Sequence, residues 1–201
     1  MKLFSVFAVS ALNLALAVYY YRLISKNKIR PSLAMWVFFT LAVGMSLFTY
    51  IREDSHSIWD NVLNTTDLVF VSAVTVSILL FGDHTTRFNR FDLFCLGAVT
   101  LIIAFWLITQ NHLITNLLVQ GILVIAYFPV VNRMLHTGEN HESYLIWGGM
   151  LLTALLALLS VDGELALIYT LRAVISILLL IGLMYYTDRR KKQDIAPGGT
   201  I

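Results

Sequence analysis

The sequence predicts an all-α integral membrane protein with seven transmembrane helices. Its 201 residues are 58% hydrophobic and only 13% charged, whereas about 25% of the residues in a soluble domain are charged. The hydrophobic residues also fall in long blocks, and a membrane-spanning helix needs about 20 mainly apolar residues. Seven blocks meet this requirement and leave no room for a soluble domain: 3–21, 33–51, 58–81, 91–109, 113–131, 144–160 and 164–187.

The basic residues predict how the helices are oriented. If the N-terminus lies outside, eleven of the 14 Lys and Arg residues fall in cytoplasmic segments and only two fall in outer segments. This positive-inside bias indicates that the N-terminus is out and the C-terminus is in. We therefore expect a multi-pass protein of the cell inner (plasma) membrane, with the lipid bilayer as its partner. The basic run 189–192 fits this rule, so we expect no nucleic acid partner.

Several of the runs carry local signals. The first resembles a secretory signal, but we expect it to remain as a helix, because it leads into the same repeated motif as the fifth. Pro31 and Ser32 then break one helix and cap the next. The third run opens with a polar stretch, 60–67, before it becomes fully apolar. The fifth contains Pro129. The sixth has small residues four apart from Gly149 onward, a spacing that lets membrane helices approach closely.

An internal repeat relates the two halves of the chain. The motif R-x9-S-x3-W occurs twice, with its copies 111 residues apart: Arg22, Ser32 and Trp36, then Arg133, Ser143 and Trp147. Each copy lies at a junction between two apolar runs. An internal repeat of this kind indicates the architecture of the whole chain.

The fourth run has no counterpart in this repeat, so we interpret it as a linker helix. We expect a first three-helix repeat over 1–82, a linker over 83–112, a second three-helix repeat over 113–188 and a basic disordered tail over 189–201. Because a single helix joins them, the two repeats of this 3+1+3 arrangement cross the membrane in the same direction. Transporters built from parallel repeats hold their site near the midplane, between the halves.

Three segments carry a resemblance to known proteins. RPSLAMW, RFDLFC and YFPVVNRMLHTGENHESYLIW resemble segments of a group of uncharacterised bacterial seven-helix membrane proteins. The seven-span 3+1+3 layout resembles the SWEET and PQ-loop superfamily of small-solute transporters, which implies alternating access between two halves. The proline–glutamine pair of that superfamily is absent, since Pro129 is followed by Val130, and Val18 stands where the first half would carry its proline.

Two charged residues lie inside apolar runs. Asp67 follows Ile58 by nine residues and Arg172 follows Glu164 by eight, so at a rise of about 1.5 Å per residue both lie roughly 12–13 Å below the outer surface. Charges at this depth usually pair or line a water-filled path, and they mark functional sites. We expect Asp67 and Arg172 to pair across the interface between the two halves or to line one cavity with Asn64 and Tyr169. The candidate solute-binding residues are Asn61, Asn64, Asp67, Gln120, Tyr169 and Arg172.

Other residues have expected roles in the membrane. Tryptophan is enriched at membrane interfaces, so Trp36 and Trp147 are predicted interfacial anchors. Arg22 and Arg133 are predicted anchors that extend their charged groups to the same interface. Pro129 is either a hinge for alternating access or a kink accommodated by the bundle.

The sequence offers little for catalysis or metal binding. No hydrolase or nucleotide-binding motif is present, the five histidines are divided between the two sides, and Cys95 is the single cysteine. The seventh run has no lysine for a retinal Schiff base. Glu139 and Glu142 fall in a cytoplasmic turn, where we expect them to be solvated. We therefore expect no enzyme, no metal and no cofactor.

Two functions stay open at this point. The first is a transporter or facilitator of a small polar or anionic solute, working by alternating access between two helical halves. The alternative is a non-transporting membrane protein, such as a sensor, scaffold or assembly factor. That alternative predicts a dry, closed interface and an Asp67–Arg172 pair without a cavity. The sequence leaves a homo-oligomer open in both cases.

Overall fold

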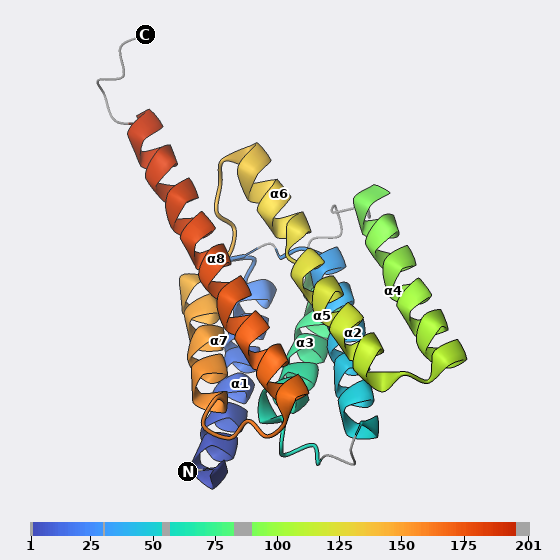
Figure 1. Ribbon diagram of the computed structural model, residues 1–201. Coiled ribbons are helices and arrows are strands. Elements are labelled where there is room, and N and C mark those ends of the chain that lie inside the picture. Colours follow the sequence, from blue (N-terminus) through green and yellow to red (C-terminus); the bar gives the residue numbers. More distant parts are fainter. Residues whose placement is uncertain (1, 30, 54–56, 83–89, 196–201) are drawn as a thin grey trace.

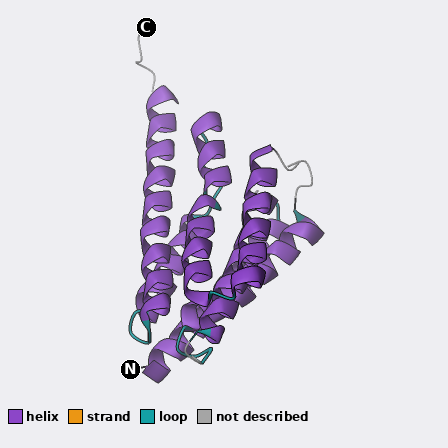
Figure 2. Cartoon of the chain, turned by 45° about the vertical axis from the view of Figure 1, so that its right-hand side comes forward, coloured by secondary structure: helices purple, strands orange, loops and turns teal. Residues whose placement is uncertain are grey.

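The computed structural model describes residues 2–29, 31–53, 57–82 and 90–195, and every regular element in these ranges is a helix (Figures 1 and 2). The helices are α1 (Lys2–Ser25), α2 (Leu33–Arg52), α3 (Val62–Phe81), α4 (Arg90–Thr109), α5 (His112–Ile125), α6 (Phe128–Thr137), α7 (Tyr144–Ala157) and α8 (Glu164–Ile195). Since α5 and α6 are two parts of one apolar segment, the described chain has seven such segments. The prediction of an all-α fold is confirmed.

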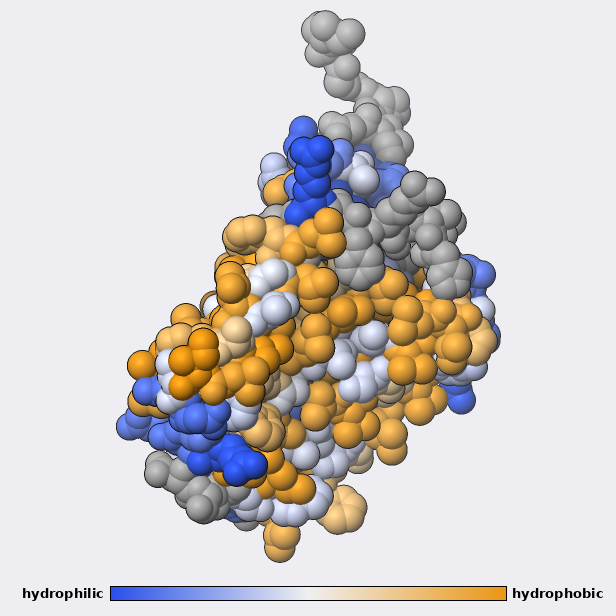
Figure 3. All heavy atoms as spheres, turned by 90° about the vertical axis from the view of Figure 1, so that its right-hand side faces the viewer, coloured by the Kyte–Doolittle hydropathy of each residue, from blue (hydrophilic) through white to orange (hydrophobic). Residues whose placement is uncertain are grey.

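Five of these segments are long and apolar enough to cross a membrane: α1, α2, α3, α5 with α6, and α8 as far as Lys191. The helix α7 and the 96–109 part of α4 are apolar but shorter. Large apolar side chains cover the outside of the bundle, for example Ile108 at 83% exposed and Leu179 at 71%. Figure 3 shows hydrophobic side chains across the middle of one face, with hydrophilic ones gathered mainly near its ends. These features are those of a helical membrane protein.

Polar caps decide where α2 and α3 begin. Ser32 accepts a hydrogen bond from the backbone of Met35, as the sequence predicts for the N-cap of α2. Asn61 caps α3 in the same way by accepting from the backbone of Asn64. The helix α3 therefore begins at Val62, four residues later than the apolar run from Ile58 suggests.

The last helix is longer than predicted. It continues from Glu164 to Ile195, so the basic residues of 189–192 are helical and do not belong to a disordered tail. Arg189 stacks over the ring of Tyr185, with its guanidinium carbon 4.6 Å from the ring centroid. The predicted tail beyond 195 lies outside the described residues, as does the side chain of Cys95.

The helices pack in a regular order. α3 lies against both α1 and α2, and α8 lies against both α7 and the α5–α6 segment. The two sets meet where α1 packs on α7 and where α2 packs on α5. α4 packs on α5 and α2, at one side of the bundle (Figure 1). Gly149 allows the close approach of α7 to α1, because a Cβ there would lie 2.5 Å from a methyl group of Leu16.

The fifth apolar segment is broken at the residues before its proline. α5 ends at Ile125, Ala126 and Tyr127 form a turn, and Pro129 occupies the first turn of α6. Proline has no N–H to continue the hydrogen-bond ladder, and its ring clashes with the preceding turn, so a break here is expected. Whether Pro129 moves as a hinge stays a prediction.

Trp36 and Trp147 lie in the core of the bundle. Both are 0% exposed, and their rings stack on each other with centroids 6.4 Å apart and 29° between the planes. An interfacial anchor must reach the lipid head groups, so the predicted anchoring role is wrong for this pair. Arg22 is exposed in the last turn of α1, and its anchoring role stays a prediction.

Candidate solute-binding site

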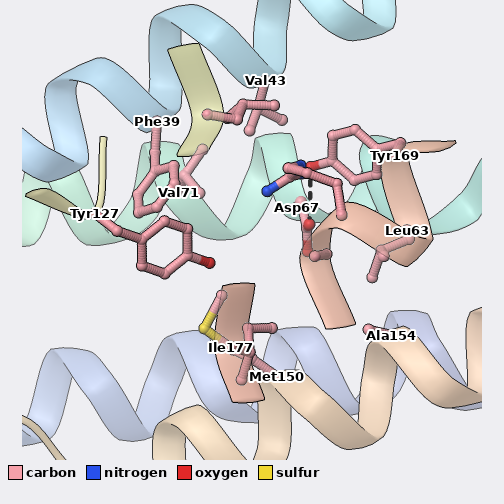
Figure 4. A pocket seen from close by; sticks show the side chains of 13 residues that line it. Phe39, Val43, Leu63, Asp67, Val71, Tyr127, Met150, Ala154, Tyr169 and Ile177 are labelled. Atoms are coloured by element: carbon pink, nitrogen blue, oxygen red, sulfur yellow. Dashed lines mark hydrogen bonds between the residues drawn. The ribbon is translucent and has the colours of Figure 1, made fainter. Parts of the chain in front are cut away.

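Asp67 projects from α3 into the middle of the bundle and is 9% exposed. Tyr169 of α8 donates its hydroxyl hydrogen to Asp67 Oδ2 at 2.9 Å, the bond drawn in Figure 4. Asn13 of α1 donates from Nδ2 to the other carboxylate oxygen at 3.1 Å. Each oxygen of a carboxylate accepts about two hydrogen bonds, so Asp67 keeps room for a further donor.

Arg172 lies one helical turn beyond Tyr169 on α8, since residues three apart share one helix face. Its guanidinium carbon lies 4.7 Å from the centroid of the Tyr169 ring, a cation–π geometry. Its Nε donates to Gln120 Oε1 at 3.2 Å. Tyr169 thus contacts Asp67 through its hydroxyl group and Arg172 through its ring.

Asp67 and Arg172 do not form an ion pair. Among the residues that the structure describes, no carboxylate lies within 4.0 Å of the Arg172 nitrogens. Both residues instead line one cavity. Tyr169 lines this cavity with them, whereas Asn64 does not.

The cavity lies between α2, α3, the α5–α6 segment, α7 and α8 (Figure 4). Its volume is about 20 Å³, which is room for about one water molecule. Asp67, Arg172, Tyr169 and Tyr127 supply its polar groups, and the rest of the wall is apolar, including Phe39, Val43, Leu63, Val71, Leu123 and Met150.

A network of polar side chains contacts Arg172 through Gln120. Gln120 Nε2 donates to Ser46 Oγ at 3.1 Å and to Asn116 Oδ1 at 3.0 Å. Asn116 Nδ2 in turn donates to the backbone oxygen of Ser46 at 2.9 Å. Gln120, Asn116 and Ser46 are buried, whereas Arg172 is only partly buried. The network connects α8 through α5 to α2 and fixes the orientation of Gln120, which accepts from Arg172.

The predicted site residues therefore separate into three groups. Asp67, Tyr169 and Arg172 line the cavity, and Gln120 supports Arg172. Asn64 is buried against Ser46 of α2, with 2.9 Å between the amide and the hydroxyl group. Asn61 caps α3 and, like Asn64, is absent from the cavity wall.

Two residues of the site were not predicted from the sequence. Asn13 holds Asp67 in place, and Tyr127 lines the cavity from the break between α5 and α6. The signal for Asn13 is an amide in the middle of an otherwise apolar run, because a polar group at that depth needs a partner. The signal for Tyr127 is its position just before Pro129.

A second buried carboxylate, that of Glu142, lies in the turn between α6 and α7, beside the C-terminal end of α1. The side chain of Glu142 is 0% exposed and accepts from Arg133 Nη2 at 3.2 Å. It also accepts from the Tyr20 hydroxyl and from Trp147 Nε1, both at 3.3 Å. The prediction that Glu142 is solvated is therefore wrong, because packing of α1 against α7 encloses this turn. The side chain of Arg133 is 21% exposed, and its anchoring role stays a prediction.

Burial raises the pKa of Glu142 above its ordinary value of 4.5, although the Arg133 guanidinium acts in the opposite direction. Glu139, three residues earlier, is exposed and binds Lys191 at 2.8 Å. The Lys191 ammonium holds the pKa of Glu139 below 4.5. One short turn therefore contains two glutamates whose pKa values are shifted in opposite directions.

No family model, no curated protein and no solved structure matches this chain.

Proposed function

We propose that the chain is a membrane transporter or facilitator that moves a small polar or anionic solute by alternating access between two helical halves. The observation that carries the proposal is the cavity between α3 and α8, where Asp67 and Arg172 both contribute to the wall without pairing. Asp67 is buried and Arg172 is partly buried, and a buried charge that is kept apart from an opposite charge costs free energy. A solute that contacts both charged groups offsets this cost.

The packing of the helices supports two parallel repeats about one axis. Ser5 of α1 is hydrogen-bonded to Ser160 beyond α7 at 2.8 Å, and Asn116 of α5 donates to Thr49 of α2 at 3.0 Å. Ser5 and Asn116 are 111 residues apart, as are Thr49 and Ser160. The α1–α7 contact and the α5–α2 contact thus use corresponding positions.

Residues related by the repeat also touch each other, which supports an axis that passes between them. Trp36 and Trp147 stack at 6.4 Å and have the same 111-residue spacing. The third helices of the two halves also touch, because Tyr169 of α8 donates to Asp67 of α3, although these two residues are not themselves related by the 111-residue spacing. Parallel repeats related by an axis along the membrane normal are a known transporter plan, and the SWEET-like layout implies the same plan.

The proposed setting is the inner (plasma) membrane, with the N-terminus out and the C-terminus in. The eleven basic residues predicted on the cytoplasmic side support this orientation. In this orientation the cavity belongs to the outer half of the bundle, and the Glu142 cluster to the cytoplasmic end.

The test is a thermal-shift screen of small metabolites on the purified protein, followed by uptake of each hit into proteoliposomes. We expect Arg172→Gln to weaken binding of a hit by about tenfold or more, because a hydrogen bond to a charged group contributes roughly 1.5–3 kcal/mol. The matched control is Arg189→Gln, which removes an exposed arginine that stacks on a tyrosine of the same helix.

Unchanged binding and uptake in Arg172→Gln would contradict the assignment of the site. Binding of a hit without any uptake would favour the alternative, a sensor that recognises the same solute. Arg172→Lys separates the two contributions of the residue, since it keeps the charge and loses the planar donor geometry.

A further inference from the structure

The cavity that Asp67 and Arg172 share has a charge pattern that limits which solutes it accepts. Within the described residues, its wall contains one carboxylate, one guanidinium group, two tyrosines and otherwise apolar side chains. The charges are opposite, and they are held by different helices on either side of Tyr169.

Each charged residue has hydrogen-bonding capacity that no described residue uses. Arg172 commits its Nε to Gln120, and no bond from its two terminal nitrogens to another described residue is present. The terminal N–H groups of a guanidinium bind a carboxylate in a bidentate way. Asp67 accepts one hydrogen bond at each oxygen and can accept one more at each.

Electrostatics then distinguishes three classes of solute. A simple anion that binds Arg172 adds a second negative charge beside the Asp67 carboxylate. A simple cation that binds Asp67 adds a second positive charge beside Arg172. A buried charge without a partner is costly, and a solute with both charges satisfies each wall residue and leaves the site neutral overall.

Resting on the proposed function, we infer that the solute is a zwitterion whose ammonium group binds Asp67, whose carboxylate binds Arg172 and whose body is apolar. Small apolar amino acids have this chemistry. The apolar part of the wall, formed by side chains such as Leu63, Val71 and Leu123, matches an aliphatic side chain. In the present state the cavity holds only about 20 Å³, so the two halves move apart when the solute enters.

The experiment compares amino acids with analogues that each lack one charge. The purified full-length chain is tested by calorimetry or thermal shift against alanine, valine and leucine. Leucine is matched by 4-methylpentanoate, which lacks the ammonium group, and by 3-methylbutylamine, which lacks the carboxylate. Propionate and ethylamine match alanine in the same way.

We expect at least one of the amino acids to bind about tenfold or more tightly than both of its analogues, since each analogue loses one charge-assisted contact. In Asp67→Asn the difference between the amino acid and its carboxylate analogue should shrink. In Arg172→Gln the difference from the amine should shrink. The wild-type panel carries the test alone if a variant does not fold.

Two results would overturn the inference. One is an analogue with a single charge that binds as tightly as its parent amino acid, and in that case the proposed transport of an anionic solute still stands. The other is that none of the amino acids binds. The proposed function itself fails only if the broad metabolite screen and the uptake assay are also negative.

Discussion

Asp67 and Glu142 are two buried carboxylates with similar neighbours, but only Glu142 forms an ion pair with its arginine. Each accepts a hydrogen bond from a tyrosine hydroxyl, of Tyr169 for Asp67 and of Tyr20 for Glu142. Each also has an arginine nearby. Arg133 lies 3.2 Å from the Glu142 carboxylate, whereas Arg172 turns its Nε to the amide of Gln120.

The two carboxylates therefore differ in how fully other side chains of the protein bind them. The Glu142 carboxylate is tied to α1, α6 and α7 by three donors, which is how a buried charge stabilises packing. The Asp67 carboxylate lines a cavity and keeps unused acceptor capacity. We infer that Glu142 has a structural role and that Asp67 belongs to the binding site.

The largest expected effect is the loss of stability on removing the Glu142 carboxylate. Glu142→Ala leaves the Tyr20 hydroxyl and Trp147 Nε1 without their acceptor and breaks the contact to Arg133. Removing one member of a buried ion pair costs about 3–5 kcal/mol. Chemical unfolding in detergent micelles measures this change.

Glu139→Ala is the matched control, because it removes an exposed glutamate from the same turn. Surface ion pairs such as the one between Glu139 and Lys191 contribute little to stability, so we expect almost no change in the free energy of unfolding. Equal stability of the two variants would show that Glu142 is not the structural carboxylate that its contacts indicate.

The next effect is an opposite pH dependence for the two glutamates. Because burial raises the pKa of Glu142, its contribution to stability is full below the unfolded value of 4.5 and falls as the pH rises through the folded value. The lowered pKa of Glu139 gives a contribution that is present above 4.5 and is lost as the pH falls through the folded value.

Unfolding free energies measured against pH for the wild type, Glu142→Gln and Glu139→Gln check these signs. The amount by which the unfolding free energy of the wild type exceeds that of Glu142→Gln should decrease as the pH rises above 4.5. The same difference for Glu139→Gln should increase with pH, by a smaller amount, since Glu139 is exposed to solvent. A wild-type advantage over Glu142→Gln that grows with pH would mean that Arg133 outweighs the effect of burial.

The same two regions show what the sequence could predict. Asp67 and Arg172 stand out because a charged residue inside an apolar run is costly and therefore informative. Their shared depth followed from counting residues along two helices. Pro129 likewise marked the break between α5 and α6, since that effect is local to the chain.

The region around Glu142 could not be predicted in this way. The turn that contains it is short and polar, which favours exposure on local grounds. Its burial depends on Tyr20, which lies 122 residues earlier in the chain and reaches Glu142 only after α1 packs on α7. The pairing of Trp36 with Trp147 is equally non-local, and their positions at helix starts favoured the wrong interpretation.

Among the two buried carboxylates, the smaller expected effect on stability is that of Asp67→Asn, which is also the sharpest test of the comparison. This change breaks no ion pair, and it keeps one oxygen that accepts from either Tyr169 or Asn13. The loss of one hydrogen bond to a charged group and the relief of burying that charge oppose each other, so we expect a change within about 1 kcal/mol. Unfolding in detergent measures it beside Glu142→Ala. If Asp67→Asn destabilises the protein as much as Glu142→Ala does, the Asp67 charge holds the fold together and its role in binding loses its basis. If Asp67→Asn keeps its stability and loses solute binding, the Asp67 carboxylate serves to bind the solute and is not needed for the fold.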